Sequence, residues 1–173
     1  MMATRKPHLE ELLSHRDIVY SVARNMGRYS SEAEEITLKT FASACEWLPS
    51  ATPRPNLRTW LCGIAANISL IRAGSHPEVP IASAREHESN ELAELLRRAL
   101  GQLDARVRAV FVLCDLASLT AEETANILQA SPREIRIQLH RARLALREVL
   151  DAFFKQRMRG DAPWLAGRVT MPE

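Results

Sequence analysis

The sequence predicts an all-α fold made of two small helical domains joined by a flexible linker. Apolar residues recur at three- and four-residue steps through most of the chain, which is the spacing of one helix face. No segment shows the sustained alternation of apolar and polar residues that is typical of a strand. Proline, glycine and serine interrupt the helical pattern over residues 73–89. We therefore expect a first domain over residues 1–72, the linker over 73–89, a second domain over 90–157 and a tail over 158–173.

Three helices are expected in the first domain. The first spans about residues 7–26, and the second runs from Ser30 or Ser31 to about Trp47 before a proline-rich loop at 49–55. Asn56 can cap the third, since asparagine side chains accept from free N–H groups at helix starts. We expect the third helix to bury an apolar stripe consisting of Leu57, Trp60, Leu61, Ile64, Ile68 and Ile71. Because tryptophans on such stripes usually belong to the core, Trp47 and Trp60 are expected to be buried.

The second domain ends in a helix-turn-helix pattern. Thr120 and Glu123 have the spacing of a capping box, which predicts a short helix that ends near Leu128. A three-residue turn follows, in which Gln129 stands where glycine would be favoured. Ser131 and Pro132 suit the cap and first position of a long helix. Its buried face is expected to hold Ile135, Leu139, Ala142, Leu146, Val149 and Phe153.

Composition restricts the class of protein. The chain has 173 residues, 46% of them hydrophobic, a formal net charge of +2 and three cysteines. No apolar run approaches the roughly 20 residues that span a bilayer, so we expect no membrane insertion. The cysteines are widely spaced and form no CxxC pair, which suits a reducing compartment and predicts a cytoplasmic protein.

The long helix carries a charge pattern that favours nucleic acid. Residues 131–173 hold nine basic and five acidic side chains. Arginine can bind phosphate or guanine, and glutamine can pair with adenine in the major groove. The overall charge of +2 is small for a protein that holds DNA alone, so we expect a larger partner to supply much of the affinity. The candidate DNA-binding residues lie off the buried stripe and are Arg133, Arg136, Gln138, His140, Arg141 and Arg143.

Across residues 9–153 the sequence resembles the extracytoplasmic-function group of sigma-70-type RNA polymerase sigma factors. LTAEETANILQASPREIRIQLHRARLALREVL is similar to the segment whose second helix reads the −35 promoter element. SEAEEITLKTFASACEWL resembles the helix that binds the polymerase clamp, and NLRTWLCGIAANISL resembles the helix that helps to open the −10 element. The resemblance implies that the first domain binds polymerase and opens the −10 element, and that the second reads the −35 element.

The resemblance also implies site residues in the first domain. Asn67 stands where the family reads a −10 base, and the loop at 49–55 corresponds to a pocket-forming loop. Arg58 and Arg72 would hold the backbone of the DNA strand. The implied polymerase-binding residues are Glu35, Leu38 and Lys39.

Partners follow from the same resemblance. They are the RNA polymerase core (through its β′ clamp and β flap), promoter DNA and an anti-sigma factor, with no cofactor and no metal.

The chain departs from the family pattern at Leu38 and Lys39, where Gln-Glu is usual, at Gln129, and at Ile137, where a small polar residue is common.

Two other functions fit the sequence less fully. One is a sigma-like mimic that sequesters an anti-sigma factor, which Lys39 favours slightly. The other is a helix-turn-helix regulator that acts without polymerase. An enzyme is not expected, since the five histidines are scattered and no phosphate-binding loop, HExxH or nucleophile motif occurs.

Overall fold

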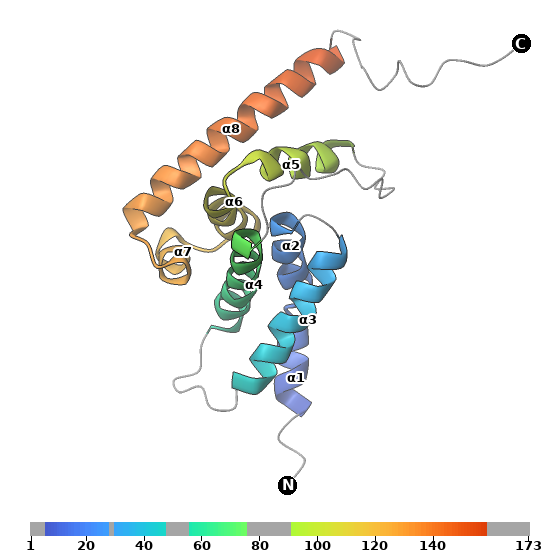
Figure 1. Cartoon of the computed structure of the whole chain (residues 1–173), viewed down its shortest axis with the longest axis vertical. Helices are drawn as coiled ribbons and strands as arrows, with labels where there is room; N and C mark the ends of the chain where they lie inside the picture. The colour runs from blue at the N-terminus through green and yellow to red at the C-terminus, as the bar shows by residue number, and fades with distance from the viewer. Residues whose placement is uncertain (1–5, 28–29, 48–55, 76–90, 159–173) are drawn as a thin grey trace, which may run out of the picture.

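The structure, a computed structural model, describes residues 6–27, 30–47, 56–75 and 91–158. All regular elements within these ranges are helices, which confirms the all-α prediction (Figure 1). None of the described helices is both long enough and apolar enough to cross a membrane.

The first half of the chain forms four helices. They are α1 (Lys6–Leu13), α2 (Arg16–Met26), α3 (Ser30–Trp47) and α4 (Leu57–Ser75). Helices α2, α3 and α4 pack against one another, and α1 contacts α3. Helix α4, which is the third helix predicted from the sequence, begins as expected, because the Asn56 Oδ1 atom accepts from the backbone N–H of Thr59 at 3.3 Å. It also runs to Ser75, three residues into the segment that the sequence assigned to the linker.

The single helix expected over residues 7–26 is interrupted at Ser14 and His15. The Ser14 hydroxyl donates to the carbonyl of Glu11 at 2.7 Å, and the His15 N–H donates to Leu12, only three residues back. These bonds close the last turn of α1 tightly. His15 then leaves the helical conformation at φ −95°, ψ 7°, and its carbonyl accepts from Val19 to begin α2.

The burial of α3 and α4 confirms part of the predicted α4 stripe, in which Leu61 is buried and Trp60 is half-buried, and it corrects two residues. On α3, Ile36, Thr40 and Ala44 are buried. The prediction that Trp47 is buried is wrong, since Trp47 is the last residue of α3 and is 66% exposed. The prediction that Ile71 is buried is also wrong, because Ile71 lies near the end of α4 and is 70% exposed. The buried face of α4 consists mostly of small side chains and includes Leu61, Cys62, Ala65, Ala66 and Ser69.

The second half begins with α5 (Glu91–Gln102) and α6 (Ala105–Phe111), continues in a π-helical turn η2 (Val112–Leu116) and ends with α7 (Ala121–Leu128) and α8 (Pro132–Met158). Helix α8 is much longer than α7 and projects along the edge of the molecule (Figure 1). Its predicted buried face is confirmed in part, since Ile135, Ala142 and Leu146 are buried. The other three predicted residues, Leu139, Val149 and Phe153, are half-buried. A small second core forms where α5 meets α8 and contains Ala99, Leu100 and Leu146.

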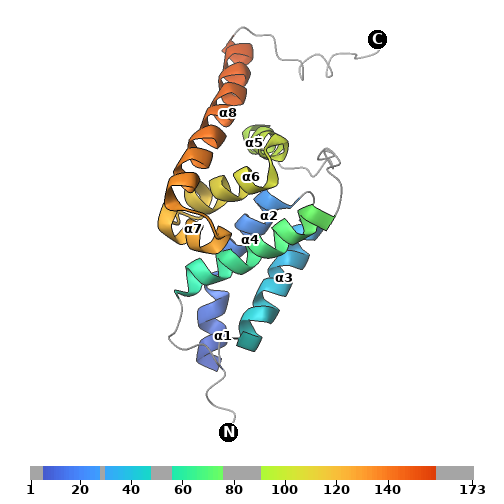
Figure 2. The ribbon, with the colours of Figure 1, turned by 60° about the vertical axis from the view of Figure 1, so that its left-hand side comes forward.

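The two halves pack directly against each other (Figure 2). Buried residues of the first half, such as Val22 and Leu61, belong to the same apolar core as Val110 and Leu113 of the second. At Gly63 a Cβ atom would lie 3.1 Å from the Cγ1 atom of Ile127, so glycine permits the close approach of α4 and α7. The surface of α4 that faces α6 and α7 is therefore covered in this conformation.

Candidate nucleic-acid interface

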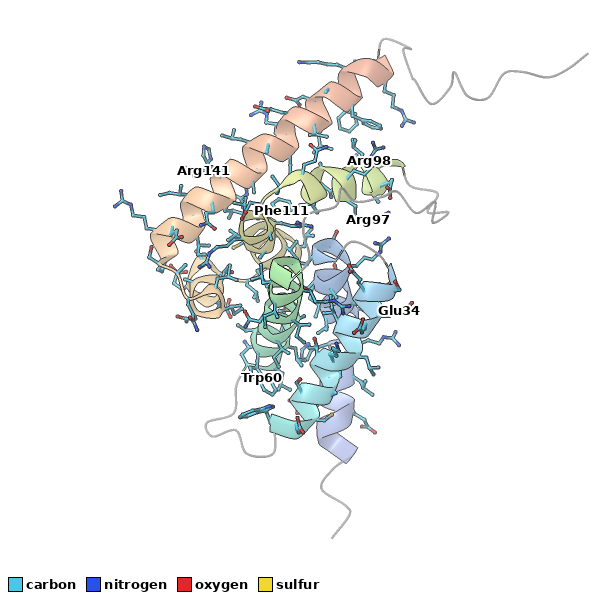
Figure 3. All side chains as sticks on the ribbon, viewed as in Figure 1. Glu34, Trp60, Arg97, Arg98, Phe111 and Arg141 are labelled. Carbon is cyan, nitrogen blue, oxygen red and sulfur yellow. The ribbon has the colours of Figure 1, made fainter. Side chains whose placement is uncertain are left out.

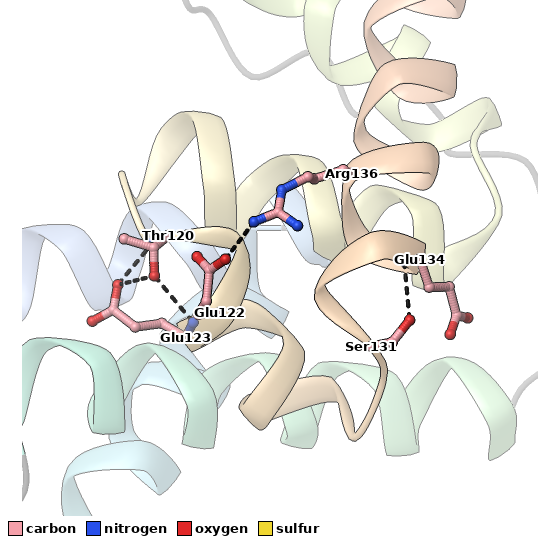
Figure 4. A network of polar contacts seen from close by, with 6 residues as sticks. All are labelled: Thr120, Glu122, Glu123, Ser131, Glu134 and Arg136. Atoms are coloured by element: carbon pink, nitrogen blue, oxygen red, sulfur yellow. Dashed lines mark hydrogen bonds and ion pairs between the residues drawn. The ribbon is translucent and has the colours of Figure 1, made fainter.

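Capping side chains build the helix-turn-helix (Figure 4). The Thr120 hydroxyl accepts from the backbone N–H of Glu123 at 3.1 Å, and the Glu123 carboxylate accepts from the backbone N–H of Thr120 at 2.9 Å. The predicted capping box is thus confirmed. At the start of α8, Ser131 Oγ accepts from the N–H of Glu134 at 3.1 Å, which confirms the second predicted cap.

Gln129 closes α7 in the left-handed conformation that the sequence flagged. Its backbone has φ 50° and ψ 52°, a region that disfavours residues with a Cβ atom. Its N–H donates to the carbonyl of Ala125, so the residue completes the helix end as glycine commonly does. The turn therefore keeps the usual geometry at the expense of local strain.

Of the six candidate DNA-binding residues on α8, five are exposed and Gln138 is half-buried. Arg141 points away from α5 and α6 on the outer side of α8 (Figure 3). The Gln138 side-chain amide donates to Glu134 at 3.1 Å within the same helix. The exposed members are Arg133, Arg136, His140, Arg141 and Arg143.

Two of these arginines are held by carboxylates of neighbouring elements. Arg136 forms an ion pair with Glu122 of α7. Arg143 donates twice to Asp115 of η2, at 2.9 and 2.6 Å. These hydrogen bonds, and then the charge of Asp115, raise the pKa of the Arg143 guanidinium above its usual value. Both pairs fix the flank of α8 against the rest of the domain and partly neutralise its positive charge.

The three implied −10 residues lie on α4 in different environments. Asn67 is exposed. Arg58 donates through Nη2 to the carbonyl of Ala117, 2.9 Å away in the second half of the chain. Arg72 forms an ion pair with Glu35 of α3 at 2.8 Å. The structure therefore does not bring the three together, and the loop at 49–55 lies outside the described residues.

Glu35 joins residues to which the resemblance gave separate roles. Its carboxylate also lies 2.7 Å from the ammonium of Lys39, one turn further along α3. The hydrogen bond from Lys39, followed by that from Arg72, lowers the pKa of Glu35 below its usual value. The side chain thus ties the implied polymerase-binding helix to the implied −10 helix.

Leu38 projects from α3 into solvent and is 72% exposed. Beside it lies a shallow groove of about 400 Å³, whose lining includes Leu13, Tyr20 and Phe41. Leu13 and Tyr20 are themselves substantially exposed. Apolar side chains gathered in this way are typical of a surface that a partner protein covers.

The contact between the halves includes a hydrogen bond that the sequence does not predict. The Thr59 hydroxyl of α4 donates to Oε1 of Glu123 at 2.7 Å. The backbone N–H of Thr120, and next the Thr59 hydroxyl, lower the pKa of Glu123. The capping box did identify Glu123, but no local pattern links it to a threonine 64 residues away.

Two of the three cysteines, Cys62 and Cys114, lie in surroundings that disfavour the thiolate form. Burial raises the pKa of Cys62 to about 11 and raises that of Cys114, so both thiols stay protonated near neutral pH. Within the same ranges, no three His, Cys, Asp or Glu side chains gather as a possible metal site.

Family models match both halves of the chain. The model "Sigma-70 region 2" matches residues 12–73, and "Sigma-70, region 4" matches residues 93–146. A curated relative, the ECF RNA polymerase sigma factor SigE of Mycolicibacterium smegmatis, is 29% identical over 160 residues, which cover 83% of this chain. The match spans 62% of the length of that relative.

Solved structures with a similar fold include two complexes. One is the sigma factor RpoE with the anti-sigma factor NepR from Bartonella quintana, with a TM-score of 0.70 and 24% identity, covering 84% of this chain and 98% of the other. The second is CnrH with the cytosolic domain of CnrY, with a TM-score of 0.64 and 26% identity, covering 83% of this chain and 86% of CnrH. Both similarities extend over the two halves of the chain.

Proposed function

The chain belongs to the extracytoplasmic-function group of the sigma-70 family, and from this we propose that it directs core RNA polymerase to specific promoters. The observation that carries the proposal is the order of its parts. A region 2 match that contains an exposed Asn67 on α4 precedes a region 4 match that ends in a capped helix-turn-helix with an arginine-rich outer face. In this function the polymerase performs the chemistry, and the chain itself only binds and positions.

Region 4 would read the −35 element through α8. A helix of this kind enters the major groove with its N-terminal residues against base edges. Arg133, His140 and Arg141 have the exposure that this role requires. Arg136 and Arg143 would position α8 and approach phosphates, since their guanidinium groups already bind Glu122 and Asp115.

Region 2 would open the −10 element along α4. A base that leaves the stack needs polar groups that recognise its edge, and Asn67 offers both a donor and an acceptor. Arg72 would contact the strand beside it. Asn67→Ala is expected to impair strand opening while leaving polymerase association intact.

Promoter binding in this account requires the two halves to separate. Elements about 25 base pairs apart lie about 85 Å apart along B-DNA. A compact chain of this length has a radius of gyration of only about 16 Å. The bonds from Arg58 to Ala117 and from Thr59 to Glu123 would therefore break when both elements are bound, and Arg58 would become available to DNA.

The proposed protein partners follow from the same assignment. Helix α3 would face the β′ clamp with Glu35, Leu38 and Lys39, and region 4 would contact the β flap. The protein would act in the cytoplasm. An anti-sigma factor is a further proposed partner. The support for it is that RpoE, which has a similar fold, was solved with the anti-sigma factor NepR.

Binding to purified core polymerase tests the proposal against its alternatives. The full chain should co-elute with core polymerase, and the complex should enrich particular duplexes from a random pool. A sigma-like mimic would not co-elute with core polymerase, and a polymerase-independent regulator would enrich duplexes equally well without it. Either result would overturn the proposed function.

A further inference from the structure

Helix α8 carries an apolar side chain in the middle of its outer face. Ile137 is 46% exposed, and it lies one helical turn from both Arg133 and Arg141. His140 lies on the same side, so basic and apolar groups alternate on this face. Ile135, two residues earlier, is fully buried, which orients the helix and leaves Ile137 directed away from the core.

The polar residues that first suggested base recognition lie mostly on the flanks of α8. Arg136 and Arg143 point toward Glu122 and Asp115, and half-buried Gln138 binds Glu134. None of these three occupies the centre of the outer face. The side chains nearest to that centre in the first turns of α8 are Arg133, Ile137, His140 and Arg141.

We propose that Ile137 is a specificity-determining residue that recognises the C5-methyl group of a thymine in the −35 element. The inference rests on the proposed function, since it requires α8 to enter the major groove. Isoleucine offers no hydrogen bond, and the thymine methyl is the apolar group that base pairs present in that groove. The flanking arginines would bind phosphates or guanine and hold Ile137 against the base edges.

Leu144 provides a matched control on the same helix. It is 47% exposed, so its truncation removes nearly the same apolar surface as truncation of Ile137. Seven residues further along α8 it lies about 10 Å from Ile137. Because the N-terminal residues of such a helix reach the bases, Leu144 is not expected to contact the same methyl group.

Replacement of thymine by deoxyuridine tests the proposal, since it deletes the methyl group and keeps every hydrogen bond of the base pair. Core polymerase with the full chain first selects duplexes from a random pool, and each thymine of the selected −35 site is then replaced singly. The wild-type complex should lose affinity about fourfold at one position, which corresponds to one buried methyl-sized group. The Ile137→Ala complex should bind the thymine duplex about as weakly as the wild-type complex binds the deoxyuridine duplex, and it should lose no further affinity with deoxyuridine. The Leu144→Ala complex should respond to deoxyuridine as the wild type does.

Three results would overturn the inference. One is a wild-type complex that tolerates deoxyuridine at every position, and another is an Ile137→Ala complex that keeps the full penalty. The third is an Ile137→Ala chain that binds DNA normally but has lost affinity for core polymerase, since this would make the face a protein contact. If the wild-type complex selects no duplex at all, the proposed function itself has failed, which is a separate outcome.

Discussion

The hydroxyl of Thr59 on α4 donates at 2.7 Å to the carboxylate of Glu123, the same group that caps α7 by accepting from Thr120. One side chain therefore both begins the helix-turn-helix and attaches it to the helix implied in opening the −10 element. Together with the bond from Arg58 to Ala117, it links the two halves in this conformation.

Removing the Thr59 hydroxyl should weaken the contact between the halves. Thr59→Val keeps the shape of the side chain and is expected to lower the free energy of unfolding by about 0.5–1.5 kcal/mol, the usual contribution of one hydrogen bond. Urea unfolding measures this. Thr37→Val is the matched control, since the Thr37 hydroxyl bonds to Ala33 within its own helix. A Thr59→Val chain that is as stable as the wild type would contradict a stabilising role for the bond from Thr59 to Glu123.

A low pH should remove the contribution of the Glu123 carboxylate to the stability of the fold. Because the pKa of this carboxyl is lowered in the folded chain, its ionised form stabilises the fold, fully above the ordinary pKa of 4.5 and progressively less as the pH falls through the lowered value. The difference in unfolding free energy between wild type and Glu123→Gln should therefore be largest near pH 7 and shrink toward pH 3. A difference that does not change with pH would show that ionisation of Glu123 contributes nothing.

Glu122 should limit the affinity of α8 for DNA. Glu122→Gln releases Arg136 and removes a negative charge beside the outer face. We expect the affinity for a selected duplex to rise roughly two- to fivefold, as for the loss of an exposed ion pair, when measured by fluorescence anisotropy at fixed salt. Glu94→Gln makes the same change of charge on α5, where Glu94 binds Arg97. A similar gain in that control would mean that net charge alone is responsible.

Leu38 should contribute to polymerase binding without contributing to the fold. Leu38→Ala is expected to weaken association with core polymerase about tenfold, since a leucine side chain buried in an interface contributes about 1.5 kcal/mol. The melting temperature of the variant should stay unchanged, because Leu38 is 72% exposed in the free chain. Leu92→Ala, an exposed leucine on α5, serves as the control. Unchanged association of Leu38→Ala with polymerase would remove this residue from the interface.

Local signals predicted the second half of the molecule best. The capping residues Thr120 and Ser131 have unambiguous roles because their hydrogen-bond partners lie three residues away. Burial near helix ends was harder to predict. The periodicity that placed Trp47 in the core continues past the point where α3 leaves the neighbouring helices. The break after Leu13 depends on a serine hydroxyl that turns back to its own helix, which apolar spacing does not report.

Long-range contacts were beyond the reach of periodicity. The pairs that join Arg143 to Asp115 and Thr59 to Glu123 connect residues 28 and 64 positions apart. Arginines on a helix face look equivalent in the sequence. Only the fold separates Arg141, which extends outward, from Arg143, which a carboxylate holds.

Run-off transcription tests the central claim most directly. Core polymerase is supplied with a library of upstream regions, with and without the full chain, beside a parallel reaction that contains a sigma factor of known activity. We predict transcripts that appear only when the chain is present, with start sites that follow a shared pair of upstream elements. No new transcript, in a preparation where the known sigma factor is active, would contradict the assignment of this chain as a promoter-directing subunit.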